Sequence, residues 1–220
     1  MERRSRPAKL GEEFMGYCLD MSTGDMREVV RLLTAVERTA DQERRLGLIR
    51  EQCMQTDLRL REQGIAFGVS VARALEELIE GVVSTNVCPA YMYAFRHVVA
   101  SHFSDTTDLG AWSRPSWFFA LGDELARYGV PVDLLPGTFL FSGPPLRLPH
   151  PGDAFPQIGI FPAQRAAELA GSYEAVLHRL GPDYRDTAAR FAELMRFEAD
   201  EWENAQKLGR TPDTIFFWFR

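Results

Sequence analysis

Five consecutive large apolar residues, Ile-Phe-Phe-Trp-Phe, occupy positions 215–219, just before Arg220. A membrane-spanning helix needs about 18 apolar residues, so this run is far too short to cross a bilayer. It predicts a closing strand from Thr214 to Arg220. A second apolar run, from Phe14 to Met21, is followed by Ser-Thr-Gly-Asp and predicts a strand leading into a helix cap. Because the termini of compact domains are often close together, we expect the two strands to be neighbours in a small sheet covered by helices on one side.

Between these strands, apolar residues recur at helical spacing, and capping residues, prolines and glycines mark the helix ends. Residues 105–113 are expected to form a loop, because no periodic apolar pattern covers them. The predicted helices are 26–36, 41–61, a segment from Ser70 to Val82, a segment from Pro89 to Phe103, 115–128, 162–180 and 182–208.

Residues 130–162 differ from the rest of the chain, because prolines interrupt short apolar pieces throughout. Proline cannot donate a hydrogen bond to a sheet, so we expect edge strands and ordered loop here. The extended pieces are predicted at 138–141 and 157–161. The predicted fold class is therefore α+β, with residues 1–13 as a flexible N-terminal tail and residues 14–220 as one helix-rich domain. Its small sheet is formed by the N- and C-terminal strands and the proline-rich extended segment.

Composition restricts the classes of function. The chain has 220 residues, of which 45% are hydrophobic, and a formal net charge of −6. The acidic balance repels phosphate backbones and predicts no nucleic-acid partner. No apolar segment follows the basic N-terminus, so we expect neither a secretory signal nor a membrane segment. Cys18, Cys53 and Cys88 are widely spaced and odd in number, which predicts reduced thiols and a soluble cytoplasmic protein.

Several segments resemble a known group. They are Ala-Leu-Glu-Glu-Leu-Ile-Glu-Gly from 74, Tyr-Ala-Phe from 93, the Trp112 and Trp117 pair, Gly-Val-Pro from 129, Gly-Pro-Pro-Leu-Arg-Leu-Pro from 143, Asp-Ala-Phe-Pro-Gln-Ile-Gly from 153, and the aromatic C-terminal strand. Together they resemble an actinobacterial protein family of unknown function that is distantly similar to YfbM-like domain proteins. The resemblance extends from about Phe14 onward. It implies a fold and assigns no catalytic residue.

Common cofactor and metal motifs are absent. The sequence has no GxxxxGK[ST] or GxGxxG phosphate loop, no GxSxG elbow and no HExxH. We therefore expect no cofactor and no metal site.

The best candidate for acid/base chemistry is His102, on the apolar face of the predicted aromatic helix. A histidine there can act as a general base, with Asp123 or Glu124 of the next helix as an orienting carboxylate. The alternative is a core histidine bonded to backbone. His97 lies roughly 140° from His102 around a helix with 3.6 residues per turn, so the two cannot share one metal ion.

Aromatic residues suggest a ligand pocket formed by Trp112, Trp117, Tyr91 and Phe95. Such residues at helical spacing also form an ordinary core. Glu198 and Glu201 are close enough for paired-carboxylate chemistry, or they belong to a solvated helix face. Arg27, Arg31 and Arg38 form a basic side that can face an acidic partner, or that simply faces water.

Two hypotheses of function follow, and the residues leave open whether the chain is an enzyme. The first is a non-catalytic binding or regulatory protein, immunity-like or partner-binding. The alternative is a small-molecule enzyme of specialised metabolism using histidine acid/base chemistry in the aromatic pocket. The expected partner is accordingly a protein or a small-molecule ligand. A weaker idea is a homo-oligomer built on the aromatic C-terminal strand.

Overall fold

The computed structural model describes residues 17–82, 87–112, 115–149 and 155–220, with the backbone alone at 111 and 112. The predicted tail, residues 1–13, lies outside them. The described elements are β1 (Tyr17–Gly24), α1 (Met26–Thr34), α2 (Ala40–Glu62), α3 (Val71–Glu80), α4 (Ala90–Ala100), β2 (Thr107–Trp112), α5 (Pro115–Arg127), α6 (Pro136–Phe139), β3 (Gln157–Pro162), α7 (Ala166–Glu174), α8 (Pro182–Lys207) and β4 (Thr214–Phe219), with short 3₁₀ turns at Val132–Leu134, Ala163–Arg165 and Leu177–Arg179.

The fold is a helix-rich α+β domain around one antiparallel sheet of order β2-β1-β4-β3. The strands nearest the two ends of the chain pair directly, with Leu19 opposite Phe219 and Gly24 opposite Thr214. The predicted adjacency of these strands is confirmed. The first strand extends past Met21 to Gly24, and Asp25 then caps α1 by accepting a hydrogen bond from the Arg27 N–H at 3.0 Å.

Both faces of the sheet are covered by helices, so the expectation of one covered face is wrong. In β4, Ile215, Phe217 and Phe219 point into one apolar core, formed with α5, α6, α7 and α8, which we call the upper core. Phe216 and Trp218 point into a second core, formed with α1–α4, which we call the lower core. Successive side chains of a strand alternate between faces, so an unbroken apolar run belongs in a central strand that is buried on both sides.

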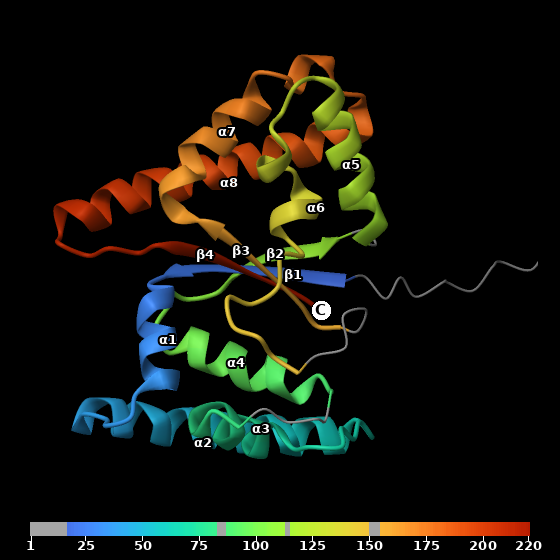
Figure 1. Cartoon of the computed structure of the whole chain (residues 1–220). Coiled ribbons are helices and arrows are strands. Elements are labelled where there is room, and N and C mark those ends of the chain that lie inside the picture. Colours follow the sequence, from blue (N-terminus) through green and yellow to red (C-terminus); the bar gives the residue numbers. More distant parts are fainter. Residues whose placement is uncertain (1–16, 83–86, 113–114, 150–154) are drawn as a thin grey trace, which may run out of the picture.

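The helices on the α1–α4 side form two layers. Figure 1 shows α4 between the sheet and the pair α2 and α3, which lie farthest from the sheet. Local caps define these helices. Thr39 and Gln42 form a reciprocal capping box at the start of α2, and Ser70 caps α3 as expected. No helix of the described residues combines the length and apolarity that a membrane crossing requires.

Strand β2 was not predicted, because its sequence looks like a turn. Gly110 has a left-handed φ of +86°, and its N–H donates to the Asp108 carboxylate at 2.7 Å. The pairing with β1 shifts register at this point. Glycine with positive φ is typical of a β-bulge, so a turn signature here lies inside a strand.

The proline-rich segment is only partly extended. Gln157–Pro162 is an edge strand, as expected. On the side that faces no other strand, its Ile158 O accepts a hydrogen bond from the Gly143 N–H at 2.9 Å. The predicted extended piece at 138–141 instead begins within the short helix α6, which Pro136 starts. The single helix predicted over 162–180 is interrupted: α7 ends at Glu174, and 3₁₀ turns lie on either side of it.

Candidate functional site

A groove lies on the α1–α4 side of the sheet, and we call it the Arg38 groove. It encloses about 1100 Å³. Its walls come from three parts of the chain that are distant in sequence: the end of α1 with the following loop, the end of α3, and a segment that returns after α6. The lining residues are 33–36, Arg38, 77–82, Val87 and 146–149.

Local backbone structure brings these three walls together. Helix α3 ends at Gly81, whose left-handed φ of +67° reverses the chain, and the Val82 N–H returns to Glu77 O at 2.9 Å. The returning segment is held by the Cys88 N–H, which donates to Pro149 O at 3.1 Å. The groove is therefore formed by the end of a helix and by a hydrogen bond between two segments that are distant in the sequence.

The walls of the groove are apolar and partly open to solvent. Leu146 and Leu148 pack against the lower core, while Val36 is 97% exposed and Val87 is 57% exposed at the rim. Exposed apolar side chains gathered beside a hollow are typical of a binding surface.

Two arginines in this groove have no carboxylate partner among the described residues. Arg38 makes one long hydrogen bond, from Nη2 to Ile79 O at 3.4 Å, and its Nε is buried with no acceptor in the described structure. Arg147 is exposed and appears in no ion pair of the described part of the chain. A buried donor without an acceptor costs about 1–3 kcal/mol, so a ligand that supplies an acceptor gains that much.

Acidic side chains in the groove only partly offset these charges. Glu77 is 9% exposed and accepts a hydrogen bond from Arg73 Nε at 2.9 Å. It also accepts a hydrogen bond from the Tyr91 hydroxyl. Arg73 thus compensates the charge of Glu77, and exposed Glu80 is the other acidic residue among the described residues that line the groove. The local balance favours an anionic ligand.

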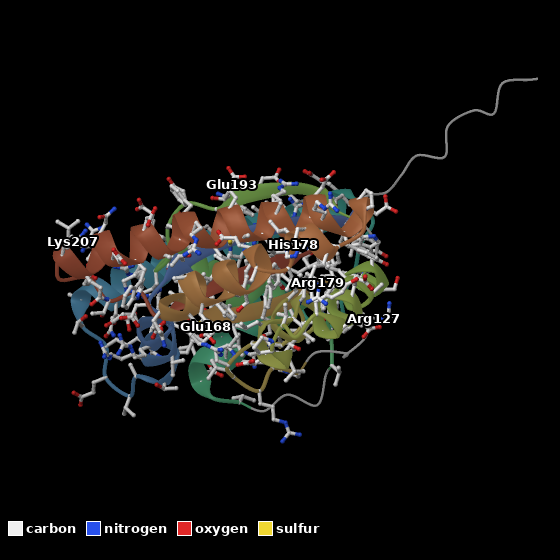
Figure 2. All side chains as sticks on the ribbon, turned by 90° about the horizontal axis from the view of Figure 1, so that it is seen from above. Arg127, Glu168, His178, Arg179, Glu193 and Lys207 are labelled. Carbon is white, nitrogen blue, oxygen red and sulfur yellow. The ribbon has the colours of Figure 1, made fainter. Side chains whose placement is uncertain are left out.

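The opposite face of the molecule is different. Figure 2 shows Glu168, His178, Arg179 and Glu193 spread along the layer of α7 and α8. Two of its arginines form ion pairs: Arg196 pairs with Glu174 at 2.6 Å, and Arg165 pairs with Glu168 at 2.7 Å. The Arg179 guanidinium lies 4.2 Å from the Tyr128 ring centre. His178 is exposed.

The predicted catalytic group is not assembled. His102 follows α4, on the α1–α4 side, whereas Asp123 and Glu124 belong to α5, on the other side of the sheet. The His102 ring instead lies 3.0 Å from Val98 O and 2.8 Å from Ser101 Oγ. Burial lowers the pKa of His102. The predicted pairing of His102 with Asp123 or Glu124 is wrong because residues 107–112, which were predicted to be a loop, form β2 and carry the chain from one face of the sheet to the other.

The predicted aromatic pocket is also divided. Tyr91 and Phe95 are fully buried in the lower core, where Phe95 lies 6.4 Å from Phe216 between ring centres. Trp117 packs in the upper core, against Phe118 and Tyr184. Trp112 ends β2, and its side chain lies outside the described residues. Of the three residues whose side chains are described, Tyr91 is connected to the Arg38 groove through its hydrogen bond to Glu77.

His97 has a structural environment. Its Nε2 lies 2.8 Å from Thr56 Oγ1 on α2, so it joins α4 to α2. Burial, followed by the charges of Arg96 and Arg59, lowers the pKa of His97 to about 4.

Glu198 is not part of a solvated face. It is 8% exposed and accepts a hydrogen bond from Thr23 Oγ1 at 2.6 Å. Burial raises the pKa of Glu198, and the charge of Glu201 adds to this effect. Within the described residues, no three His, Cys, Asp or Glu side chains are grouped as metal ligands.

Of the Arg38 groove, the sequence revealed Arg38 as one of three basic residues that can face an acidic partner. Arg147 and the apolar walls were missed. Their only signals were an arginine between leucines at 146–148 and a glycine at a helix end, which are common features.

Comparison with protein families gives one match. The family described as "Domain of unknown function (DUF7691)" matches residues 15–218. Neither the curated proteins nor the solved structures contain a match to the chain.

Proposed function

We propose, given that the chain belongs to the DUF7691 family, that it is a non-catalytic binding protein of immunity-like or regulatory type. Its Arg38 groove would hold an acidic segment of a protein partner. Carboxylates of that segment would meet Arg38 and Arg147, and its apolar side chains would lie against the valine and leucine walls.

The observation that carries this proposal is the presence, inside an apolar groove, of two arginines with no carboxylate partner among the described residues. A carboxylate can accept two parallel hydrogen bonds from one guanidinium, and such pairs are stronger than neutral hydrogen bonds. At Arg38, an incoming carboxylate would also satisfy the buried Nε. Arg147 lies on the returning segment and would fix a second point of the bound chain.

The open, apolar rim of the groove favours a peptide segment over a small metabolite. Pockets for small molecules typically measure 300–1000 Å³ and enclose most of the ligand. The Arg38 groove is about 1100 Å³ and has a rim of exposed apolar residues, which suits an extended chain.

The lining also supports binding over catalysis. Among the described residues that line the groove, Thr34 supplies the only side-chain hydroxyl, and none is a histidine or a cysteine. The enzyme hypothesis relied on His102 with Asp123 or Glu124, and the separation of these residues removes its proposed acid/base pair.

The test is selection from a random peptide library displayed on phage, with the purified protein as bait. We expect enrichment of peptides in which Asp or Glu is flanked by apolar residues. Binding of a synthesised winner should fall at least tenfold in Arg38→Met and in Arg147→Met, which corresponds to about 1.4 kcal/mol each. Arg31→Met is the matched control, because Arg31 is exposed, pairs with Glu28 and lies outside the groove.

Winners that bind both groove variants as tightly as the unaltered protein would refute the proposal. So would winners without acidic residues. A folded state that matches the unaltered protein by circular dichroism is required of each variant, so that a loss of binding reports on the groove.

Two finer assignments are also proposals. We propose a cytoplasmic location, supported by three free cysteines, of which Cys53 and Cys88 are buried. A fractionation experiment on the native host tests it. We also propose that the chain belongs to an actinobacterial group that is distantly similar to YfbM-like domain proteins, supported by the edge strand at Gln157–Pro162 and its following turn. Structural superposition on an experimentally solved YfbM-like domain would test that relation.

A further inference from the structure

Helix α2 carries an exposed stripe of six residues on the side facing away from the protein core. Leu46, Ile49, Cys53 and Leu60 are buried on its inner side. Figure 1 shows α2 at the outer limit of the molecule, beyond α4. The residues of the outer stripe are Arg44, Leu48, Glu51, Gln55, Leu58 and Glu62, all exposed.

The spacing within the outer stripe alternates between four and three residues, which keeps all six on one helix face. Leu48 is 59% exposed and Leu58 is 55% exposed. Exposed leucines indicate an interaction surface when they belong to a larger apolar patch.

A shallow apolar hollow adjoins the second half of the outer stripe. It encloses about 520 Å³ and is lined by Met54, Leu58, Ile65 and Phe67, among others. Met54 is 52% exposed and Ile65 is 43% exposed. Leu48, in the first half of the outer stripe, is not among the residues that line this hollow.

We propose that the outer stripe of α2 binds the same stripe of a second copy of this chain, antiparallel, about a two-fold axis level with Cys53. In this arrangement Leu48 of one copy enters the apolar hollow beside Leu58 of the other. Arg44 meets Glu62, and Glu51 meets Gln55.

The reason for choosing a second copy is that the stripe is complementary to itself. Each of the three pairs lies symmetrically about position 53, so a two-fold axis there brings every pair together twice. The charges at the two ends of the stripe are opposite, basic at Arg44 and acidic at Glu62, and a parallel arrangement would set like charges against each other.

The ion pairs present in one copy do not prevent this arrangement. Arg44 contacts Asp41 one turn earlier, with the arginine side chain 76% exposed. An exposed pair of this kind is worth about 0–1 kcal/mol, so Arg44 can turn toward Glu62 of the second copy at little cost.

This surface replaces the oligomer contact suggested by the sequence. The aromatic strand β4 lies between β1 and β3, with Trp218 and Phe219 almost fully buried, so it has no free edge. The proposed pairing through α2 is also separate from the Arg38 groove, because the two sets of lining residues do not overlap.

The test is sedimentation equilibrium of the full chain over a range of concentrations. We expect a reversible dimer. Leu58→Glu and Leu48→Glu should each raise its dissociation constant about 100-fold, because each buries an unpaired charge. Leu208→Glu is the matched control, since Leu208 is 74% exposed at the end of α8 and should leave the dimer unchanged.

Charge reversal tests the antiparallel register. Arg44→Glu and Glu62→Arg should each weaken the dimer about fivefold, and the double variant should restore it. The proposal is wrong if the unaltered chain is a monomer at several hundred micromolar, or if neither leucine variant weakens the dimer. A double variant weaker than both single variants would overturn the register. Each outcome is independent of peptide binding in the Arg38 groove.

Discussion

Gly159 in β3 is the position where the structure makes its sharpest prediction about stability. A Cβ atom placed there would lie 2.4 Å from Phe139 O and 2.6 Å from Leu140 Cα. Both are backbone atoms, which cannot rotate away as the end of a flexible side chain can. The contact holds the edge strand against the end of α6, which covers its free side.

We expect Gly159→Ala to reduce the free energy of unfolding by about 3 kcal/mol, the upper end of the range for overpacked sites. For a chain of this length, this corresponds to a fall in Tm of roughly 6–12 °C. The matched control is Gly122→Ala in the middle of α5. A Cβ there meets Leu135 Cβ at 3.7 Å, an ordinary contact. Alanine is favoured over glycine in helices, so this variant should gain about 1 kcal/mol.

Urea unfolding followed by circular dichroism measures both variants. The midpoint should fall for Gly159→Ala and rise for Gly122→Ala, with no change in the slope of free energy against urea. An unchanged midpoint for Gly159→Ala would refute the close approach of β3 to residues 139–140. Equal losses in both variants would show that added volume alone, and not this contact, sets the cost.

Three further predictions concern buried titratable groups. The pKa of folded His97 is about 4, against its usual 6.5, so the fold favours the neutral imidazole. The free energy of unfolding should therefore fall by about 3 kcal/mol as the pH drops from 6.5 to 4. His97→Gln should remove this part of the loss, as measured by urea titrations at several pH values. Because the pKa of Glu198 is raised above its usual 4.5, ionisation is penalised in the fold at neutral pH; Glu198→Gln should be more stable relative to the unaltered protein at pH 7 than at pH 4.5, and a constant difference would contradict this. Burial raises the pKa of Cys53 to about 12, so its thiol should react with Ellman's reagent only after the protein is unfolded in urea. Mass spectrometry would identify the labelled cysteine. Labelling of Cys53 in the folded protein at pH 8 would contradict this and would show that its surroundings open to solvent.

The strands near the two chain ends and most helix starts could be predicted from the sequence, because their signals are local. The apolar run 215–219 and the caps at Thr39 and Ser70 each act through neighbouring residues. Buried apolar runs and capping side chains have the same meaning in almost any fold.

Unlike the strands and helix starts, the candidate functional sites depend on which distant segments the fold brings together. His102, Asp123 and Glu124 are near in sequence, yet the sheet separates them, because the intervening β2 changes the face on which the chain continues. The Arg38 groove was hidden for the opposite reason: Arg38 and Arg147 are far apart in sequence and meet only after the sheet and α3 are in place.

The sequence by itself determined the fold class, the pairing of the two strands near the chain ends and the absence of common cofactor motifs. Tertiary structure decided which face each helix covers, which carboxylates are buried and which arginines lack a partner within the described chain. The physical reason is that periodicity and capping depend on residues a few positions apart, whereas burial and charge pairing depend on contacts between distant segments.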